Sequence, residues 1–230
     1  MKLSNVFFLL ICALLFSNCT AQLNTLSKAE KSDGFVSLFD GKSLDGWHVF
    51  KNGNNFWTIE DGAIALNPGK KGGDLVTDKA YENYELNLEW KISDCGNSGI
   101  IYGVKEEGYG AVWHTGPEMQ VLDNKCHKDA KIITHRAGDL YDMISCNVET
   151  VKPAGEWNKV RLIINKGQVQ HWLNGKKVVE FEMFNDNWTA MVAKSKFKTK
   201  ADFGTIRKGK IALQDHHDKV WYRNIKIKEL

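Results

Sequence analysis

The chain has 230 residues, with 31 Lys and Arg against 28 Asp and Glu, so its formal net charge at pH 7 is +3. A balance this close to neutral argues against nucleic acid as a partner. Five cysteines are present. Three of them, Cys95, Cys126 and Cys146, permit one disulfide but imply no disulfide framework, so we expect a hydrophobic core to stabilise the fold.

The N-terminus has the features of a bacterial secretory leader. Lys2 precedes an apolar run over residues 6–16 that is too short to span a bilayer, and small residues follow it. Cys19 stands where a lipoprotein leader places its acylated cysteine, so lipidation at Cys19 and simple cleavage nearby are the two alternatives. We expect residues 1–19 to be a signal peptide and residues 20–33 a polar tether. The protein would then lie in the cell envelope of a bacterium, in the periplasm or on the cell surface, held to the outer membrane or another envelope membrane by a lipid anchor.

Residues 34–230 have the length and the pattern of a single β domain. Pairs of turn-forming residues separate runs rich in Val, Ile, Trp and Tyr, and helical periodicity is almost absent. The clearest alternation predicts strands over residues 84–92, 159–165, 168–173, 177–182, 210–215 and 220–228. Evenly spaced antiparallel strands in a chain of this length predict an all-β fold of two packed sheets.

The first of these strands has a polar face whose two ends differ. Solvent is the simplest environment for Glu85 and Asn87. Glu89 and Lys91 lie closer to the tight turn predicted near residues 97–99. We therefore expect Glu89 and Lys91 to form one wall of a site.

The most informative segment is residues 116–124, where acid and amide groups occupy alternate positions of a predicted strand. Glu118 and Gln120 share one face of that strand because successive side chains point to opposite sides. A bulge after Val121 would bring Asp123 onto the same face. Three hydrogen-bonding side chains would then converge in a site of the size of a sugar.

Several further motifs occur in an order that resembles a known family, the 3-keto-disaccharide hydrolase domain, first catalogued as a domain of unknown function. The resemblance covers about residues 34–230 and rests on the segments 38–47, 57–62, 89–91, 97–100, 117–124, 137–142, 155–158, 171–175 and 213–216. It implies a concanavalin A-like jelly-roll β-sandwich of two antiparallel sheets in a secreted or lipid-anchored bacterial protein. It also implies cleavage of glycosides whose sugar carries a ketone at C3.

Such a reaction requires a base, a group that stabilises an enolate, and an acid for the departing oxygen. A C3 ketone acidifies the proton on C2, so elimination of the C1 substituent followed by addition of water gives net hydrolysis. Glu118 is our candidate for the base or the acid, since apolar neighbours would raise its pKa. A carboxylate paired with a neighbouring Arg or Lys is the competing interpretation. Gln120 would orient sugar hydroxyls, and Asp123 would hold a proton, a cation or a loop.

Distant segments supply the remaining candidates. His216 titrates near neutrality and would carry a proton, with Gln214 on the same strand face, although an ordinary hydrogen-bonded strand histidine is the alternative. Tyr141 and Asp142 lie in a loop that would re-enter the site, where Tyr141 donates to the enolate, unless it packs in the core. Trp113 is the best candidate for stacking on a sugar ring.

A divalent cation that polarises the ketone is compatible with this composition. Mixed sets of histidine and carboxylate ligands suit such Lewis-acid chemistry, but the spacings match no compact metal signature. We therefore assign no ligands and no cofactor from the candidates His114, His127, His135, Glu118, Asp123 and Asp142.

Two other functions fit parts of the pattern. The spacing of Glu118, Gln120 and Asp123 is similar to that of retaining glucanases, in which two carboxylates lie about 5 Å apart. In this chain the middle acid is an amide and the last carboxylate is one methylene shorter, which disfavours that chemistry. A carbohydrate-binding module without catalysis is the other alternative, because lectins share the fold. The sequence does not indicate the oligomeric state.

Overall fold

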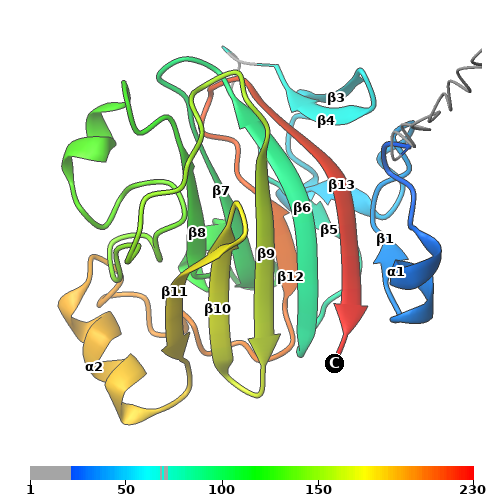
Figure 1. The fold of residues 1–230 in the computed structure, drawn as a ribbon. Helices are drawn as coiled ribbons and strands as arrows, with labels where there is room; N and C mark the ends of the chain where they lie inside the picture. Colours follow the sequence, from blue (N-terminus) through cyan, green and yellow to red (C-terminus); the bar gives the residue numbers. More distant parts are fainter. Residues whose placement is uncertain (1–21, 68, 70–71) are drawn as a thin grey trace, which may run out of the picture.

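The computed structural model describes residues 22–67, 69 and 72–230, which form two antiparallel sheets packed face to face (Figure 1). The larger sheet has the strand order β11 (Lys176–Glu182), β10 (Gln168–Leu173), β9 (Asn158–Asn165), β6 (Tyr84–Ile92), β13 (Val220–Glu229), β4 (Ala63–Leu66) and β3 (Trp57–Glu60), with β1 (Val36–Ser37) paired to β13. The smaller sheet has the order β2 (Trp47–Val49), β5 (Leu75–Thr77), β12 (Lys210–Leu213), β7 (Asn97–Val104) and β8 (Glu118–Leu122).

Short helices complete the structure without entering either sheet. Two are α-helices, α1 (Lys28–Ser32) and α2 (Asp186–Lys194), and three are 3-10 turns, η1 (Phe50–Asn52), η2 (Val112–His114) and η3 (Lys128–Lys131). The predicted β-sandwich of two antiparallel sheets is confirmed. In the described part of the chain, no helix is long and apolar enough to span a membrane.

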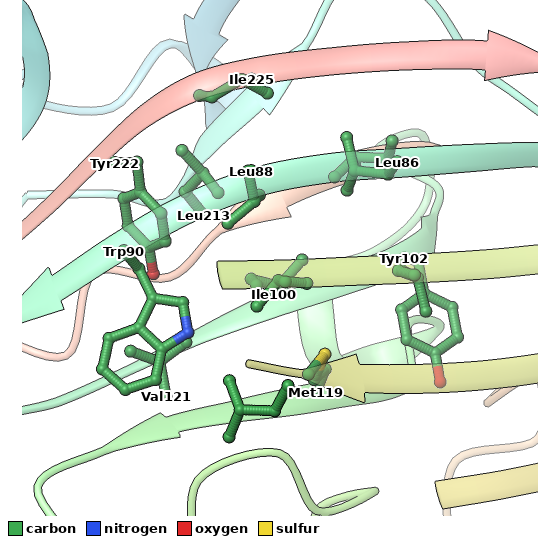
Figure 2. Close-up of a cluster of buried hydrophobic side chains, with 14 of the residues drawn as sticks. Leu86, Leu88, Trp90, Ile100, Tyr102, Met119, Val121, Leu213, Tyr222 and Ile225 are labelled. Carbon is green, nitrogen blue, oxygen red and sulfur yellow. The ribbon is translucent and has the colours of Figure 1, made fainter. Parts of the chain in front are cut away.

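The core lies between the two sheets and is built by the alternation seen in the sequence. Figure 2 shows Leu86, Leu88 and Trp90 of β6 facing side chains of the smaller sheet, among them Ile100 and Met119. All five are at most 2% exposed. Because alternate residues point to opposite faces, the neighbours of Met119 on β8 must point away from this core.

The polar stretch predicted as a tether is in part a docked segment, which corrects that expectation for residues 22–33. The backbone N–H of Asn24 donates to Asn224 Oδ1 at 2.7 Å, and that of Asn224 donates to Asn24 Oδ1 at 2.8 Å. Glu30 of α1 forms an ion pair with Lys226 of β13. The reason is a bulge in β13, whose pairing with β6 shifts between Arg223 and Lys226 and leaves Asn224 free to bind this segment. The predicted signal peptide and Cys19 lie outside the described residues.

Candidate active site

A cavity of ≈ 450 Å³ lies on the outer face of the smaller sheet, opposite the core. Six of the ten side chains predicted to act or bind in the site line it, and they come from segments far apart in the sequence. The lining residues are Asn97, Trp113, Glu118, Gln120, Tyr141, Lys196, Phe197, Lys200, Gln214 and His216. Side chains from the middle and from the end of the chain therefore line the same cavity.

Three neighbouring strands form the floor of the cavity. Gln120 of β8 lies opposite Gly99 of β7, and the Gln214 N–H donates to the Gly99 carbonyl at 2.9 Å. Opposite residues share a face of a sheet, so Gly99 lies between the two glutamines and contributes no side chain. The Glu118 carboxyl occupies the space above Gly99, where a Cβ atom would overlap it.

Substituting Gly99 with alanine is expected to displace Glu118 and to lower turnover by roughly tenfold or more, because catalytic groups tolerate little misplacement. The backbone of Gly99 does not have a positive φ, so the variant should fold. Gly110→Ala is the matched control, since its new Cβ would meet only His114 Cε1, at 3.6 Å. Steady-state kinetics and thermal melts of both variants make the comparison. Unchanged turnover in Gly99→Ala would show that the position of Glu118 is unimportant.

Tyr141 reaches the cavity because its segment runs along the edge of β8. The Gly138 N–H donates to the Gln120 carbonyl at 2.8 Å, and the Tyr141 N–H donates to the Glu118 carbonyl at 3.0 Å. The buried His171 ring supports this segment from the core, with Nδ1 3.1 Å from the Gly138 carbonyl and Nε2 3.0 Å from the Tyr102 hydroxyl. The edge strand and the histidine thus place Tyr141 beside Glu118.

Burial dominates the electrostatics of Glu118, which is 6% exposed. Desolvation raises the pKa of its carboxyl to about 8, an effect that the Lys196 ammonium opposes and that Asp74 and Asp129 reinforce. No hydrogen bond to a described residue stabilises the ionised form. Contrary to the competing interpretation, no arginine or lysine forms an ion pair with it in the described chain. Glu118 is therefore mostly protonated at neutral pH.

Lys196 is a site residue that the sequence did not predict. Its Nζ lies 3.8 Å from the centroid of the Tyr141 ring, and its backbone N–H donates to Asp142 Oδ2 at 2.8 Å. Asp142 in turn lies 3.2 Å from His135 Nε2. Burial lowers the pKa of Lys196, while Glu118 and Asp142 act to raise it. Asp142, predicted to bind substrate, does not line the cavity and instead holds the backbone that carries Lys196.

His216 enters the cavity from the loop after β12. The predicted strand over residues 210–215 ends at Leu213, so His216 is a loop residue. Its ring centroid lies 6.4 Å from that of His127. Although the side chain is partly exposed, the surrounding protein lowers the pKa of His216 below its usual 6.5 by desolvation, with His127 acting in the same direction. His216 is therefore neutral at pH 7.

Trp113 and Lys200 form an aromatic and cationic part of the cavity lining, which we call the rim. Trp113 is 40% exposed, and Lys200 Nζ lies 4.8 Å from its ring centroid and 3.3 Å from His114 Nε2. Phe197 stacks on Phe203 with a centroid separation of 3.9 Å. This stack anchors the loop that carries Lys196 and Lys200.

Two predicted wall residues lie elsewhere. Glu89 accepts a hydrogen bond from Arg223 Nε at 2.8 Å, and Lys91 Nζ lies 4.3 Å from the Trp221 ring centroid. Both side chains are on the outer face of the larger sheet, because β6 and β7 belong to different sheets although they are consecutive in sequence. The prediction that Glu89 and Lys91 line the site is wrong.

The predicted convergence of Asp123 with Glu118 and Gln120 is also wrong. The pairing of β7 with β8 shows no bulge, and β8 ends at Leu122. Asp123 accepts hydrogen bonds from the Cys95 N–H at 2.9 Å and the Lys125 N–H at 3.0 Å. It fixes the loop next to the Cys95–Cys126 disulfide, the one disulfide that the sequence permitted.

The side chains considered as ligands of a divalent cation are not gathered into one cluster. Within the described residues, three ligating atoms of this kind come together only at Cys95, Asp123 and Cys126, where the two cysteines form the disulfide. His114 contacts Lys200, and His135 contacts Asp142. These residues do not fit a metal site, and no step below depends on one.

Comparison with known proteins places this chain in a family. The chain is 36% identical over 241 aligned positions to a protein of Bacteroides thetaiotaomicron named 3-keto-disaccharide hydrolase, with 91% of this chain and 83% of the relative covered. A crystal structure of a candidate glycosyl hydrolase from Parabacteroides distasonis superposes with a TM-score of 0.85 at 35% identity, covering 91% of this chain and all of that one.

A more distant structure defines the fold alone. A protein of unknown function with a galectin-like fold from Bacillus subtilis has a TM-score of 0.51 at 14% identity and covers 91% of this chain and 95% of its own. This likeness confirms the predicted concanavalin A-like jelly roll. The sequence model of one protein family, described as the 3-keto-alpha-glucoside-1,2-lyase-like domain, matches residues 34–228. The chain belongs to that family.

Proposed function

We propose that this protein is a secreted enzyme that cleaves 3-keto-glycosides or 3-keto-disaccharides by elimination followed by hydration. The relative named 3-keto-disaccharide hydrolase and the candidate glycosyl hydrolase among the solved structures support a glycoside-acting enzyme. One observation carries the proposal further. Two titratable groups in one cavity have pKa values displaced in opposite directions, that of Glu118 upward and that of His216 downward. Such a pair is suited to acid and base roles at neutral pH.

The base in this scheme is the neutral imidazole of His216. It removes the C2 proton, and the electrons of the C2–H bond form an enolate with its charge on the C3 oxygen. The enolate then collapses, the C3 carbonyl re-forms, the C1–O bond breaks, and the departing oxygen takes a proton from the Glu118 carboxyl. Addition of water across the resulting C1–C2 double bond completes the hydrolysis.

In this scheme the enolate oxygen lies near Tyr141 and Lys196. Burial raises the pKa of Tyr141, so its phenol stays protonated and donates a hydrogen bond. The Lys196 ammonium beside the same ring supplies positive charge where the negative charge develops. Gln120, which is 1% exposed, and Gln214 orient the sugar hydroxyls, and Trp113 provides an apolar face at the rim.

Substituting Lys196 with methionine is expected to lower turnover by roughly tenfold to a hundredfold, because a preorganised charge is lost. The same change should raise the pKa of Glu118, since Lys196 is the group that lowers it. The alkaline limb of the pH profile should therefore move to higher pH. Lys198→Met, in the same loop but outside the cavity lining, is the matched control. An alkaline limb that stays in place would contradict the role of Lys196.

The alternatives are tested by one substrate panel. A retaining glucanase needs two carboxylates about 5 Å apart, and Glu118 is the single carboxylate among the lining residues of the described cavity. A binding module needs no buried acid with a raised pKa. Release of the aglycone from a 3-keto-glucoside, but not from the parent glucoside, supports the proposal. Release from ordinary β-glucan would instead identify a glucanase, and binding without turnover would identify a binding module.

We also propose that the protein is exported and anchored to the cell envelope through Cys19. The Cys95–Cys126 disulfide supports export, because disulfides persist in oxidising compartments. Cys19→Ala is expected to abolish incorporation of a labelled fatty acid and to release the protein from the membrane fraction. Fractionation and lipid labelling of the two forms measure this. Equal labelling in both forms would rule out Cys19 as the anchor.

A further inference from the structure

Two side chains in the cavity lining have a buried amide oxygen to which no described residue donates a hydrogen bond. Asn97 Oδ1 and Gln214 Oε1 are both buried, and neither accepts a hydrogen bond within the described chain. Asn97 is 3% exposed, and both side chains line the cavity. A buried amide oxygen without a donor is unfavourable, so its presence in a cavity indicates a ligand that supplies one.

The backbones that carry these two amides are fixed. The Asn97 N–H donates to Asp218 Oδ2 at 3.0 Å, and the Ser98 hydroxyl donates to the Gln214 carbonyl at 2.7 Å. Gly99, the next residue after Asn97 on this face of β7 and the one opposite Gln214, adds no side chain that could satisfy either amide. Both amides are thus attached to hydrogen-bonded backbone, at the start of β7 and just after β12, and a recognition site requires such support.

Two parts of the cavity lining differ in chemistry. Asn97, Gln120 and Gln214 form what we call the buried end, since Asn97 is 3% and Gln120 1% exposed and Gln214 Oε1 is buried. The rim has Trp113, which is 40% exposed, and the half-buried Lys200. An amide oxygen can only accept a hydrogen bond, so whatever enters the buried end must present hydroxyl or N–H donors. A sugar ring with free hydroxyls does so. A ring inside a glycan chain has one hydroxyl replaced by an ether oxygen, which has no hydrogen to donate.

We propose that Asn97 and Gln214 form a recognition pair that accepts hydrogen bonds from two hydroxyls of a terminal 3-keto sugar ring. The ring enters the buried end first, and its glycosidic substituent points toward Trp113 at the rim. This inference rests on the proposed function and specifies its substrate class: terminal, non-reducing ketosugars with free hydroxyls, cleaved in the exo mode.

Binding measurements test the pair without requiring turnover. The protein carrying Glu118→Gln is titrated calorimetrically with methyl 3-keto-glucoside and with its 4-deoxy and 6-deoxy analogues. At least one analogue is expected to bind roughly tenfold or more weakly, because its missing hydroxyl leaves an amide oxygen unpaired. Adding Asn97→Leu or Gln214→Met should remove that discrimination for the hydroxyl concerned. Adding Gln170→Met, at a half-buried position of β10 that does not line the cavity, should leave it intact.

The outcomes separate this inference from the proposed function. Equal binding of all three ligands would overturn the recognition pair, even if the wild-type enzyme turns over the ketosugar. Discrimination that persists in both amide variants would also overturn it. If an amide variant fails to fold, the deoxy ligands still test the pair in the protein that keeps Asn97 and Gln214. Oligosaccharides oxidised at a terminal or an internal ring provide the second measurement, and cleavage at the internal ring would exclude the exo mode. Absence of both binding and turnover would overturn the proposed function itself.

Discussion

Glu118→Gln is expected to lower kcat/KM at least about a hundredfold, because general acid catalysis contributes that much or more. The amide fills the same space above Gly99 but cannot donate a proton to the departing oxygen. The loss should shrink when the leaving group is a nitrophenol, since its oxygen departs without protonation. Kinetics with alkyl and nitrophenyl 3-keto-glucosides measure the difference. An equal loss on both substrates would contradict the assignment of Glu118 as the acid.

Glu89→Gln is the control for this experiment. The sequence pattern placed Glu89 in the wall of the site, but the structure places it on the outer face of the larger sheet, paired with Arg223. Turnover by Glu89→Gln should stay within about twofold of the wild type, because surface substitutions away from a site have small effects. A large loss in Glu89→Gln would mean that the outer face contributes to catalysis.

The pH profile follows from the two displaced pKa values. His216 must be neutral to act as the base, so activity is lost as the pH falls through a value below 6.5. Glu118 must be protonated to act as the acid, so activity is lost as the pH rises through about 8. A profile of kcat/KM against pH should therefore show a plateau near neutrality. The alkaline limb should disappear in Glu118→Gln, whose residual activity needs no proton at that position.

The long strands could be predicted from the sequence because each carries a full alternation. β6 and β10 have the predicted bounds, and β9 and β11 differ from them by one residue. Short strands such as β2 and β5 have three residues each, too few for a period of two to stand out. Their place in the smaller sheet is set by pairing with distant segments, which no local pattern reports.

The site could be predicted where chemistry and strand period coincide, as at Glu118 and Gln120. It could not be predicted where the path of the chain through the fold determines which side chains reach the cavity. Glu89 follows the same alternation, yet the chain passes from one sheet to the other before β7 begins. Lys196 lies in a run of lysines that is typical of a solvated loop. The stacking of Phe197 on Phe203 and the hydrogen bond to Asp142 help to bring Lys196 over Tyr141, and neither contact is visible in the sequence.

His216→Ala is expected to lower turnover at least about a hundredfold and to stop exchange of the C2 hydrogen with deuterated solvent. Removal of the C2 proton precedes departure of the C1 substituent, so a variant without the base should fail at the first step. Glu118→Gln, which lacks the acid for the later step, should still exchange this hydrogen.

Mass spectrometry of recovered 3-keto-glucoside distinguishes the two variants. His217→Ala is the matched control, because His217 is an exposed neighbour whose Nδ1 lies 3.6 Å from Asp215 Oδ1 and which does not line the cavity. It should retain both exchange and turnover. Exchange that continues in His216→Ala would transfer the role of base to another group in the cavity. Loss of exchange in Glu118→Gln alone would reverse the two assignments, with the carboxylate removing the proton.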